Sequence, residues 1–214
     1  MHNKLKNELQ NIISGKSQVS HGKLIQTIAN YLSESEESGV TFEEPKYKRK
    51  QETIRLEEYL INHNLILRDI DFNLYVSEGA EQRVYLVNNT KVIKLNDAIY
   101  YENWIDYLHN LLLHNFFFPD TAYELKGFTF DNSALYAVVE QSFIESTQST
   151  DLVAVKSFLL ENGFQLVRNN DYFHSYLGII LEDLHDENVL TNNGILYFID
   201  TVFYLTASFW ILNE

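Results

Sequence analysis

The feature that most constrains this chain is a stretch near its end, LEDLHDENVL, followed by an apolar run that ends in ILYFID. It places a carboxylate at Asp183, an amide at Asn188 and a second carboxylate at Asp200. If the two segments form a hairpin, the returning strand brings Asp200 beside Asn188. One carboxylate can then orient a hydroxyl proton while hard oxygen atoms hold magnesium against phosphates, as phosphoryl transfer requires. The competing interpretation is an acidic surface turn followed by a buried strand.

Net charge limits the classes of ligand. Acidic residues outnumber basic ones by 30 to 16, which gives a formal charge of −14. Nucleic-acid binding through many phosphate contacts needs a basic face, and a local basic cluster occurs only in KYKRK at 46–50. A nucleic-acid partner is therefore not expected. An anionic ligand such as ATP would need cations gathered locally, or a divalent metal.

Composition also limits the chemistry and the compartment. The chain has 214 residues, 45% of them hydrophobic, which suffices for one sizeable core and a smaller appendage. The absence of cysteine excludes disulfides, thiolate catalysis and zinc sites built on cysteine. No apolar run is long enough to span a membrane, and the start, MHNKLKNELQ, lacks the apolar segment of a secretory signal. These features favour a cytoplasmic protein.

The spacing of apolar residues predicts an α+β fold. A polar segment at 33–50 with Gly39 and Pro45 is typical of a linker. Helices are expected over residues 1–32, 51–63, 97–114 and 151–162. Strands are expected near Ser77, over 84–87, 92–95, 123–130 and 135–140, and in the segment from Leu177 onward.

The DLHDENVL stretch resembles the catalytic loop of the aminoglycoside and choline kinase branch of the protein-kinase-like superfamily, commonly written HGDLHPGNIL. By that resemblance Asp183 is the catalytic base, Asn188 a magnesium ligand and Asp200 the metal-binding aspartate. Three departures are visible. Leu181 stands where the family has histidine, Asp186 stands where it has proline, and D-T-V replaces the D-F-G that follows in kinases.

Upstream motifs occur in the order that this resemblance requires. KVIK resembles the strand whose lysine, here Lys94, contacts the α- and β-phosphates. SEGAEQRVYL resembles the glycine-rich loop, of whose three glycines only Gly79 remains. Glu102 is the candidate carboxylate on the following helix that would pair with Lys94. AVVEQSF resembles the hinge, with backbone groups of Glu140 and Ser142 facing adenine.

Over residues 70–205 the chain is most similar to the polyvalent protein kinase domains of bacterial mobile elements. The resemblance implies a minimal bilobal protein-kinase-like fold that uses ATP and Mg²⁺. An N-terminal helical extension with linker would occupy 1–66, an antiparallel N-lobe sheet 67–145, and a truncated C-lobe 146–214. The function implied is an ATP-dependent phosphotransferase. The alternative is a pseudokinase or ATP-binding regulatory module without turnover, which the degenerate glycine loop favours.

The residues after Asp200, TVFYLTASFWILNE, are strongly apolar. They must pack as a short helix or strand that closes the reduced C-lobe, or against a second chain. A protein partner or additional chain at this lobe is therefore expected beside the nucleotide.

Overall fold

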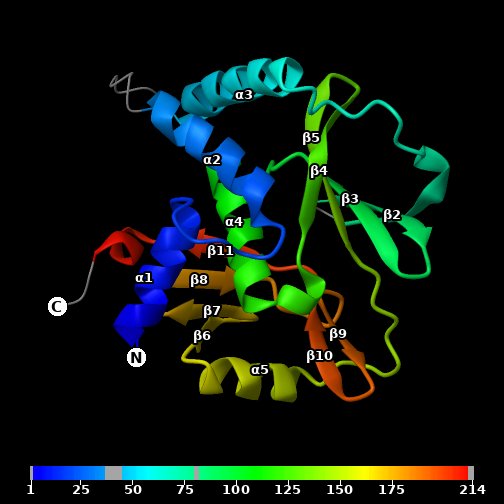
Figure 1. Cartoon of the computed structure of the whole chain (residues 1–214). Helices are drawn as coiled ribbons and strands as arrows, with labels where there is room; N and C mark the ends of the chain where they lie inside the picture. The colour runs from blue at the N-terminus through cyan, green and yellow to red at the C-terminus, as the bar shows by residue number, and fades with distance from the viewer. Residues whose placement is uncertain (1, 37–44, 80–81, 212–214) are drawn as a thin grey trace.

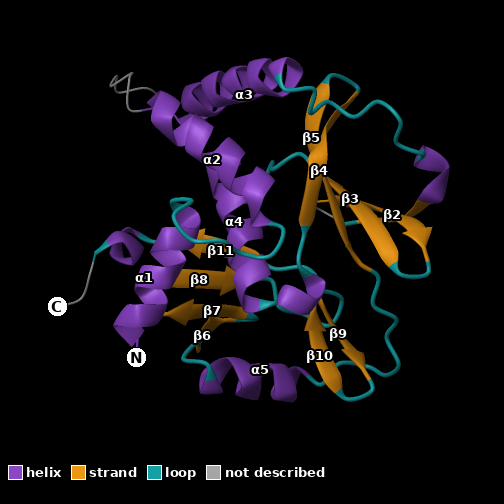
Figure 2. Cartoon of the chain, in the orientation of Figure 1, coloured by secondary structure: helices purple, strands orange, loops and turns teal. Residues whose placement is uncertain are grey.

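The computed structural model describes residues 2–36, 45–79 and 82–211 and confirms the predicted α+β class (Figure 1 and Figure 2). Three antiparallel sheets and five α-helices make up this part of the chain. The helices are α1 (His2–Ile13), α2 (Gly22–Glu36), α3 (Pro45–Asn62), α4 (Trp104–Phe117) and α5 (Leu152–Glu161). Within the described ranges, no helix is long and apolar enough to cross a membrane.

The largest sheet has five strands in the order β1-β2-β3-β5-β4. Its two faces pack differently, because successive side chains of a strand alternate between faces. Leu95 and Val138 join a small cluster on one face, whereas Val139 faces the main core and Lys94 the cavity described below. The strands are β1 (Tyr75–Glu78), β2 (Gln82–Asn88), β3 (Lys91–Asn96), β4 (Glu124–Asp131) and β5 (Ala134–Ser142).

A four-stranded sheet in the order β11-β8-β7-β6 and a separate β9-β10 hairpin form the other half of the molecule. The hairpin is inserted between β8 and β11, which pair with each other from Glu182 opposite Val202 to Ile179 opposite Leu205. This pairing brings the two loops that flank the hairpin to the same end of the sheet. The strands are β6 (Gln165–Arg168), β7 (Asp171–His174), β8 (Ile179–Glu182), β9 (Val189–Asn192), β10 (Ile195–Phe198) and β11 (Val202–Leu205).

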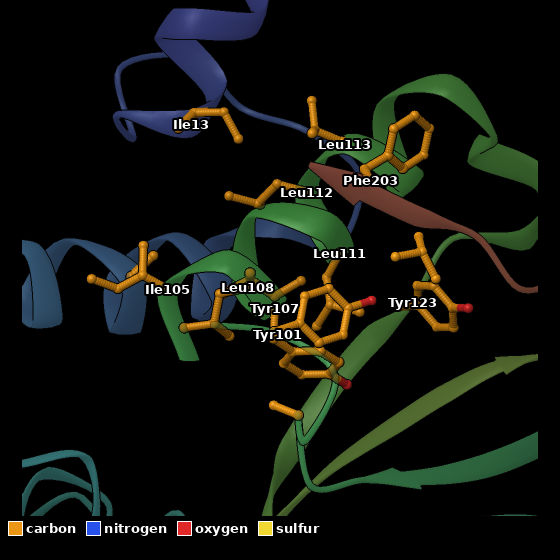
Figure 3. Packing of buried hydrophobic residues seen from close by; sticks show 14 of the residues in the cluster. Ile13, Tyr101, Ile105, Tyr107, Leu108, Leu111, Leu112, Leu113, Tyr123 and Phe203 are labelled. Carbon is orange, nitrogen blue, oxygen red and sulfur yellow. The ribbon is translucent and has the colours of Figure 1, made fainter. Parts of the chain in front are cut away.

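Helix α4 forms the centre of the core. Almost all of its length is buried, with Leu108 and Leu112 fully inaccessible. Figure 3 shows Leu112 between Ile13 of α1 and Phe203 of β11. A helix that is apolar on most of its circumference is stable only when other elements surround it. The N-terminal helices therefore belong to the core, since they cover one side of α4.

The apolar tail packs against the chain itself as far as Phe209, whereas Trp210 and Ile211 are exposed. Its first part is β11, and Ala207–Trp210 form a 3₁₀ turn in which Phe209 is fully buried. The side chains of Lys6 and Gln10 on α1 donate to the carbonyls of Ser208 and Phe209, at 2.8 and 2.6 Å. A strand and a short helical turn thus close this end of the fold, as the composition of the tail predicts.

Two predicted boundaries in the N-terminal part were wrong, and one hairpin was missed. The helix expected over residues 1–32 is two helices, because the chain turns at Gly15 (φ 71°), where a Cβ would lie 2.5 Å from the Asn30 side chain. The linker expected at 33–50 is helical at both ends: residues 33–36 complete α2, and α3 begins at Pro45, a residue that suits the first turn of a helix. Residues 37–44 lie outside the described residues. The β6-β7 hairpin was not predicted.

Candidate functional site

A cavity of about 370 Å³ opens between the five-stranded sheet and the β9-β10 hairpin. This is within the range of pockets that hold small ligands. Its walls are largely apolar, from Val84 and Leu86 on one side to Leu190 on the other. Its polar lining residues are Ser77, Gln82, Lys94, Gln141, Ser142, Glu187, Asn188 and Asp200.

The hairpin places Asp200 beside Asn188. The backbone N–H groups of Ile199 and Asp200 both donate to the Asn188 carbonyl, at 2.9 and 3.3 Å. The Asp200 carboxylate accepts hydrogen bonds from the Gln82 amide and, at 3.4 Å, from the Tyr123 hydroxyl. Burial raises the pKa of Asp200, and the nearby Lys94 opposes that rise.

Lys94 projects from β3 into the same buried space, with only 4% of its surface exposed. Its ammonium donates to the Ile199 carbonyl at 2.7 Å and lies 5.3 Å from the centre of the Tyr123 ring. Burial lowers the pKa of Lys94, and Asp200 opposes that effect. A buried ammonium and a partly buried carboxylate on one wall are costly to desolvate. Such a wall is suited to an anion held together with a cation.

Asp183 and Asn188 form a second hydrogen-bonded group at the mouth of the cavity. The Asn188 side-chain nitrogen donates to the backbone carbonyl and to Oδ2 of Asp183, both at 2.8 Å. His185 Nε2 lies 3.3 Å from the other Asp183 oxygen. Asp183 has a positive φ of 65°, a conformation that is rare outside glycine and is concentrated at functional sites. Its carboxylate remains about half exposed and open to an incoming group.

Five of the eight predicted site residues line this one cavity: Gly79, Lys94, Ser142, Asn188 and Asp200. Asp183 joins them through its hydrogen bonds to Asn188. The Gly79 N–H donates to the Gln82 carbonyl at 2.9 Å, and Ala80 and Glu81 lie outside the described residues. Gly79 and Asp200, far apart in the sequence, therefore meet at one site.

Glu102 does not join the site. The helix expected to start at Asp97 starts at Trp104, so Glu102 precedes it and is exposed to solvent. Lys94 is buried and bonded to the Ile199 carbonyl, and the two residues do not pair. The side chains of Asn96 and Asp97 instead bond the N–H groups two residues on, which stabilises turns in place of helix.

Glu140 also lies away from the cavity, because its carboxylate pairs with Lys91 at 2.6 Å. The pairing of β5 with its neighbours treats the backbones of Glu140 and Ser142 differently. The Phe143 N–H donates to the Thr90 carbonyl and so continues the hydrogen bonds between β3 and β5. In an antiparallel pair, every second residue points its N–H and carbonyl away from the partner strand. Ser142, next to Phe143, therefore points these groups away from β3. On the other side of β5, Glu124 of β4 pairs with Glu140, and β4 does not extend as far as Ser142. The backbone of Ser142 is thus available to a ligand, whereas that of Glu140 is used within the sheet.

Sequence reasoning missed a set of buried polar residues behind Asp200. Thr121 is their centre: its carbonyl accepts from Gln141 at 2.6 Å and contacts His114 Nε2 at 2.9 Å. The other nitrogen of His114 lies 2.7 Å from the Thr201 hydroxyl. These residues hold the segment after β10 in place. The sequence carries only a weak signal for this set, namely polar residues within otherwise apolar helices and strands. Such residues indicate a network only when their contacts with one another are known.

We expect His114 to make the fold sensitive to mild acid. Burial lowers its pKa to about 3, so the folded protein leaves it neutral while the unfolded chain protonates it near pH 6.5. The contribution of neutral His114 to the free energy of unfolding is fully present above about pH 6.5. It is lost as the pH falls, at up to about 1.4 kcal/mol per pH unit. Urea unfolding at pH 7.5 and 5.5 should show this loss, and His114→Gln should reduce it, the remainder coming from His109, whose pKa burial lowers to about 4. His63→Gln, at an exposed site, is the matched control; an equal reduction there would contradict the assignment.

Comparison with known proteins agrees with this geometry. A model of the family described as serine/threonine/tyrosine kinase found in polyvalent proteins matches residues 49–207, about three-quarters of the chain. No curated protein and no solved structure matches the chain. The matched range begins inside α3 and ends just after β11, so it contains every residue of the cavity.

Proposed function

Because the chain belongs to the family of serine/threonine/tyrosine kinases found in polyvalent proteins, we propose that it transfers the γ-phosphoryl group of ATP to a hydroxyl group. The observation that carries this proposal is the shared cavity wall of Lys94 and Asp200, with Asn188 at hydrogen-bonding distance from Asp183. A binding site for a neutral ligand has no need of a buried ammonium beside a partly buried carboxylate.

In this proposal the adenine base lies between the apolar side chains of Val84, Val92 and Leu190. The backbone groups of Ser142 take the hinge role, while Glu140 serves only the sheet. The Gly79 backbone lies on the phosphate side of the cavity. Lys94 binds the α- and β-phosphates with an ammonium that Tyr123 and the Ile199 carbonyl already position.

The residues present fit a magnesium ion. Because the Asn188 nitrogen is used on Asp183, its amide oxygen remains for a cation, and the Asp200 carboxylate supplies a second hard donor. Burial raises the pKa of Asp200, so a dication would favour its charged form. When bound, Mg²⁺ would neutralise charge on the β- and γ-phosphates.

Asp183 is the proposed base. Its exposed carboxylate would orient the acceptor hydroxyl and receive its proton as the oxygen bonds to the γ-phosphorus and the bond to the bridging oxygen of ADP breaks. Asn188 and His185 fix the carboxylate in place. The description of the family points to a serine, threonine or tyrosine hydroxyl as the acceptor.

The proposed architecture has two lobes with this cavity between them. The five-stranded sheet, within 67–145, is the N-lobe, and 146–214 form the reduced C-lobe. Residues 1–66 are the helical extension, although the family match already includes α3. The exposed apolar side chains of α5, Leu152, Val153, Phe158 and Leu160, are the proposed contact for a protein partner or additional chain.

The second candidate function is an ATP-binding regulatory module without turnover. It is favoured by Gln82, which occupies the third glycine position of the loop and donates a hydrogen bond to Asp200. A ligand that used Asp200 for metal binding would have to displace that contact. Turnover separates the two candidates, since both bind nucleotide.

The test of the site is metal-dependent stabilisation by nucleotide. ATP with Mg²⁺ should raise the melting temperature, because a ligand at about 100 times its Kd adds about 2.7 kcal/mol to the free energy of unfolding. Chelation of the metal, or Asp200→Ala, should remove most of this effect. Equal stabilisation by ATP in excess chelator would refute the metal role of Asn188 and Asp200.

A further inference from the structure

Helix α3 makes two sets of contacts with the segment that leads into α4. The Glu52 carboxylate, 1% exposed, accepts hydrogen bonds from the first two N–H groups of α4, those of Trp104 at 2.7 Å and Ile105 at 3.2 Å. One turn earlier, the Arg49 guanidinium donates to the carbonyls of Tyr101, Asp97 and Ala98, the last at 2.8 Å. Figure 1 shows α3 above α2 and α4.

These contacts satisfy a requirement of the helix start. The first N–H groups of a helix have no partner within the helix, and they carry the positive end of its dipole. A buried carboxylate there is stabilising, and Asn103 supplies the local cap by accepting from the Asp106 N–H at 2.8 Å. Glu52 therefore fixes where α4 begins and how far it lies from α3.

The other side of α4 holds the segment that carries Asp200. The Asn110 side-chain oxygen accepts from the Phe203 N–H at 2.9 Å, and His114 lies 2.7 Å from the Thr201 hydroxyl. All four residues are buried. The position of α4 is thus transmitted to the residues directly after Asp200, whereas Lys94 has no carboxylate partner on α4 among the described residues.

We propose that Arg49 and Glu52 are positioning residues for phosphoryl transfer: they set α4, and α4 sets Asp200 through Asn110 and His114. This inference rests on the proposed function for its effect on turnover. In protein kinases, an ion pair between a lysine on the strand and a glutamate on the following helix holds that helix in place. The inference assigns this task to Arg49 and Glu52 of α3. The link is a chain of hydrogen bonds between rigid elements, so a change at its start should appear at its end.

Glu52→Gln is the informative variant, because the amide keeps the shape and removes the charge. We expect kcat to fall about 10- to 100-fold, since small misplacements of catalytic groups have effects of this size. The KM for ATP should change less than about threefold, because the strands that form the adenine site are not touched. Glu58→Gln, exposed on the same helix, should behave as the wild type.

Two further measurements separate a positioning role from simple loss of stability. Hydrogen exchange of the Phe203 amide should become about tenfold faster in Glu52→Gln relative to that of the Val139 amide in β5, because simple loss of stability would accelerate both; this readout needs no nucleotide. The effects of Glu52→Gln and Thr201→Val on kcat should be less than additive, because independent distant sites normally add.

Additive effects, or wild-type turnover and exchange in Glu52→Gln, would overturn the inference and leave the proposed function standing. A wild-type protein that neither binds Mg²⁺ with ATP nor turns it over would overturn the proposed function. The exchange of Phe203 would still test the link from α3 to β11 in that case.

Discussion

Replacement of Asp183 by asparagine is expected to lower kcat by about 10²- to 10⁴-fold, the usual contribution of a positioned general base. The amide cannot accept the proton of the acceptor hydroxyl at neutral pH. Its oxygen can still accept from the Asn188 side chain, as Oδ2 of Asp183 does at 2.8 Å, so the loop should keep its shape. The Kd for Mg²⁺ and a non-hydrolysable ATP analogue should therefore stay within about threefold of the wild-type value. Transfer of labelled phosphate and calorimetric titration measure the two quantities.

Asp186→Asn is the matched control for this variant. Asp186 lies three residues further along the same loop and is exposed. It should retain wild-type turnover because it has no part in orienting the acceptor. If turnover survived in Asp183→Asn and was lost in Asp186→Asn, the base would have to be reassigned to Asp186.

Lys94→Met should weaken nucleotide binding about 10- to 100-fold, because a charge-assisted hydrogen bond contributes about 1.5 to 3 kcal/mol. Methionine has a similar length and suits the buried position, so the main change is loss of the cation. The variant should also lower stability at neutral pH, since it leaves Asp200 as a partly buried carboxylate without its nearby cation. Titration with the ATP analogue in the presence of Mg²⁺ measures the first effect, and urea unfolding the second.

Lys91→Met provides the comparison on the same strand. Its ammonium pairs with Glu140 at 2.6 Å in a partly exposed position outside the cavity. Loss of a surface ion pair of this kind changes stability by only about 0 to 1 kcal/mol and should not affect nucleotide binding. Equal losses of affinity in the two variants would show that the charge of the sheet as a whole, and not Lys94, attracts the nucleotide.

The parts of the site that lie close together in sequence could be predicted. Asp183, Asn188 and Asp200 are separated only by a hairpin, and hairpin pairing is determined by alternating apolar residues and a short turn. The order of the strands around Lys94 and Gly79 followed from the same kind of local pattern. The family was also predictable, because its motifs are short and local, and the match over 49–207 confirms it.

The position of Glu102 could not be predicted, because two local signals compete. Asp97 and Asn103 are both residue types that begin helices. The structure uses Asn103, and the contacts that favour it come from Arg49 and Glu52, about fifty residues earlier. Long-range hydrogen bonds of this kind leave no periodic trace in the sequence. The same limit applies to the buried polar residues around Thr121, which come from separate elements.

The pairing of β11 with β8 has a consequence for inhibition. Val202 and Phe203 follow Asp200 directly, lie in the sheet opposite Glu182 and Leu181, and are almost fully buried. Rotating Asp200 out of the cleft would break the hydrogen bonds between β11 and β8 and expose the Phe203 ring. This conformational change would cost several kcal/mol of free energy. Compounds that depend on an outward-rotated metal-binding aspartate would find no such conformer to select. Compounds that compete directly for the space beside Ser142 and Lys94 would bind the protein as it stands.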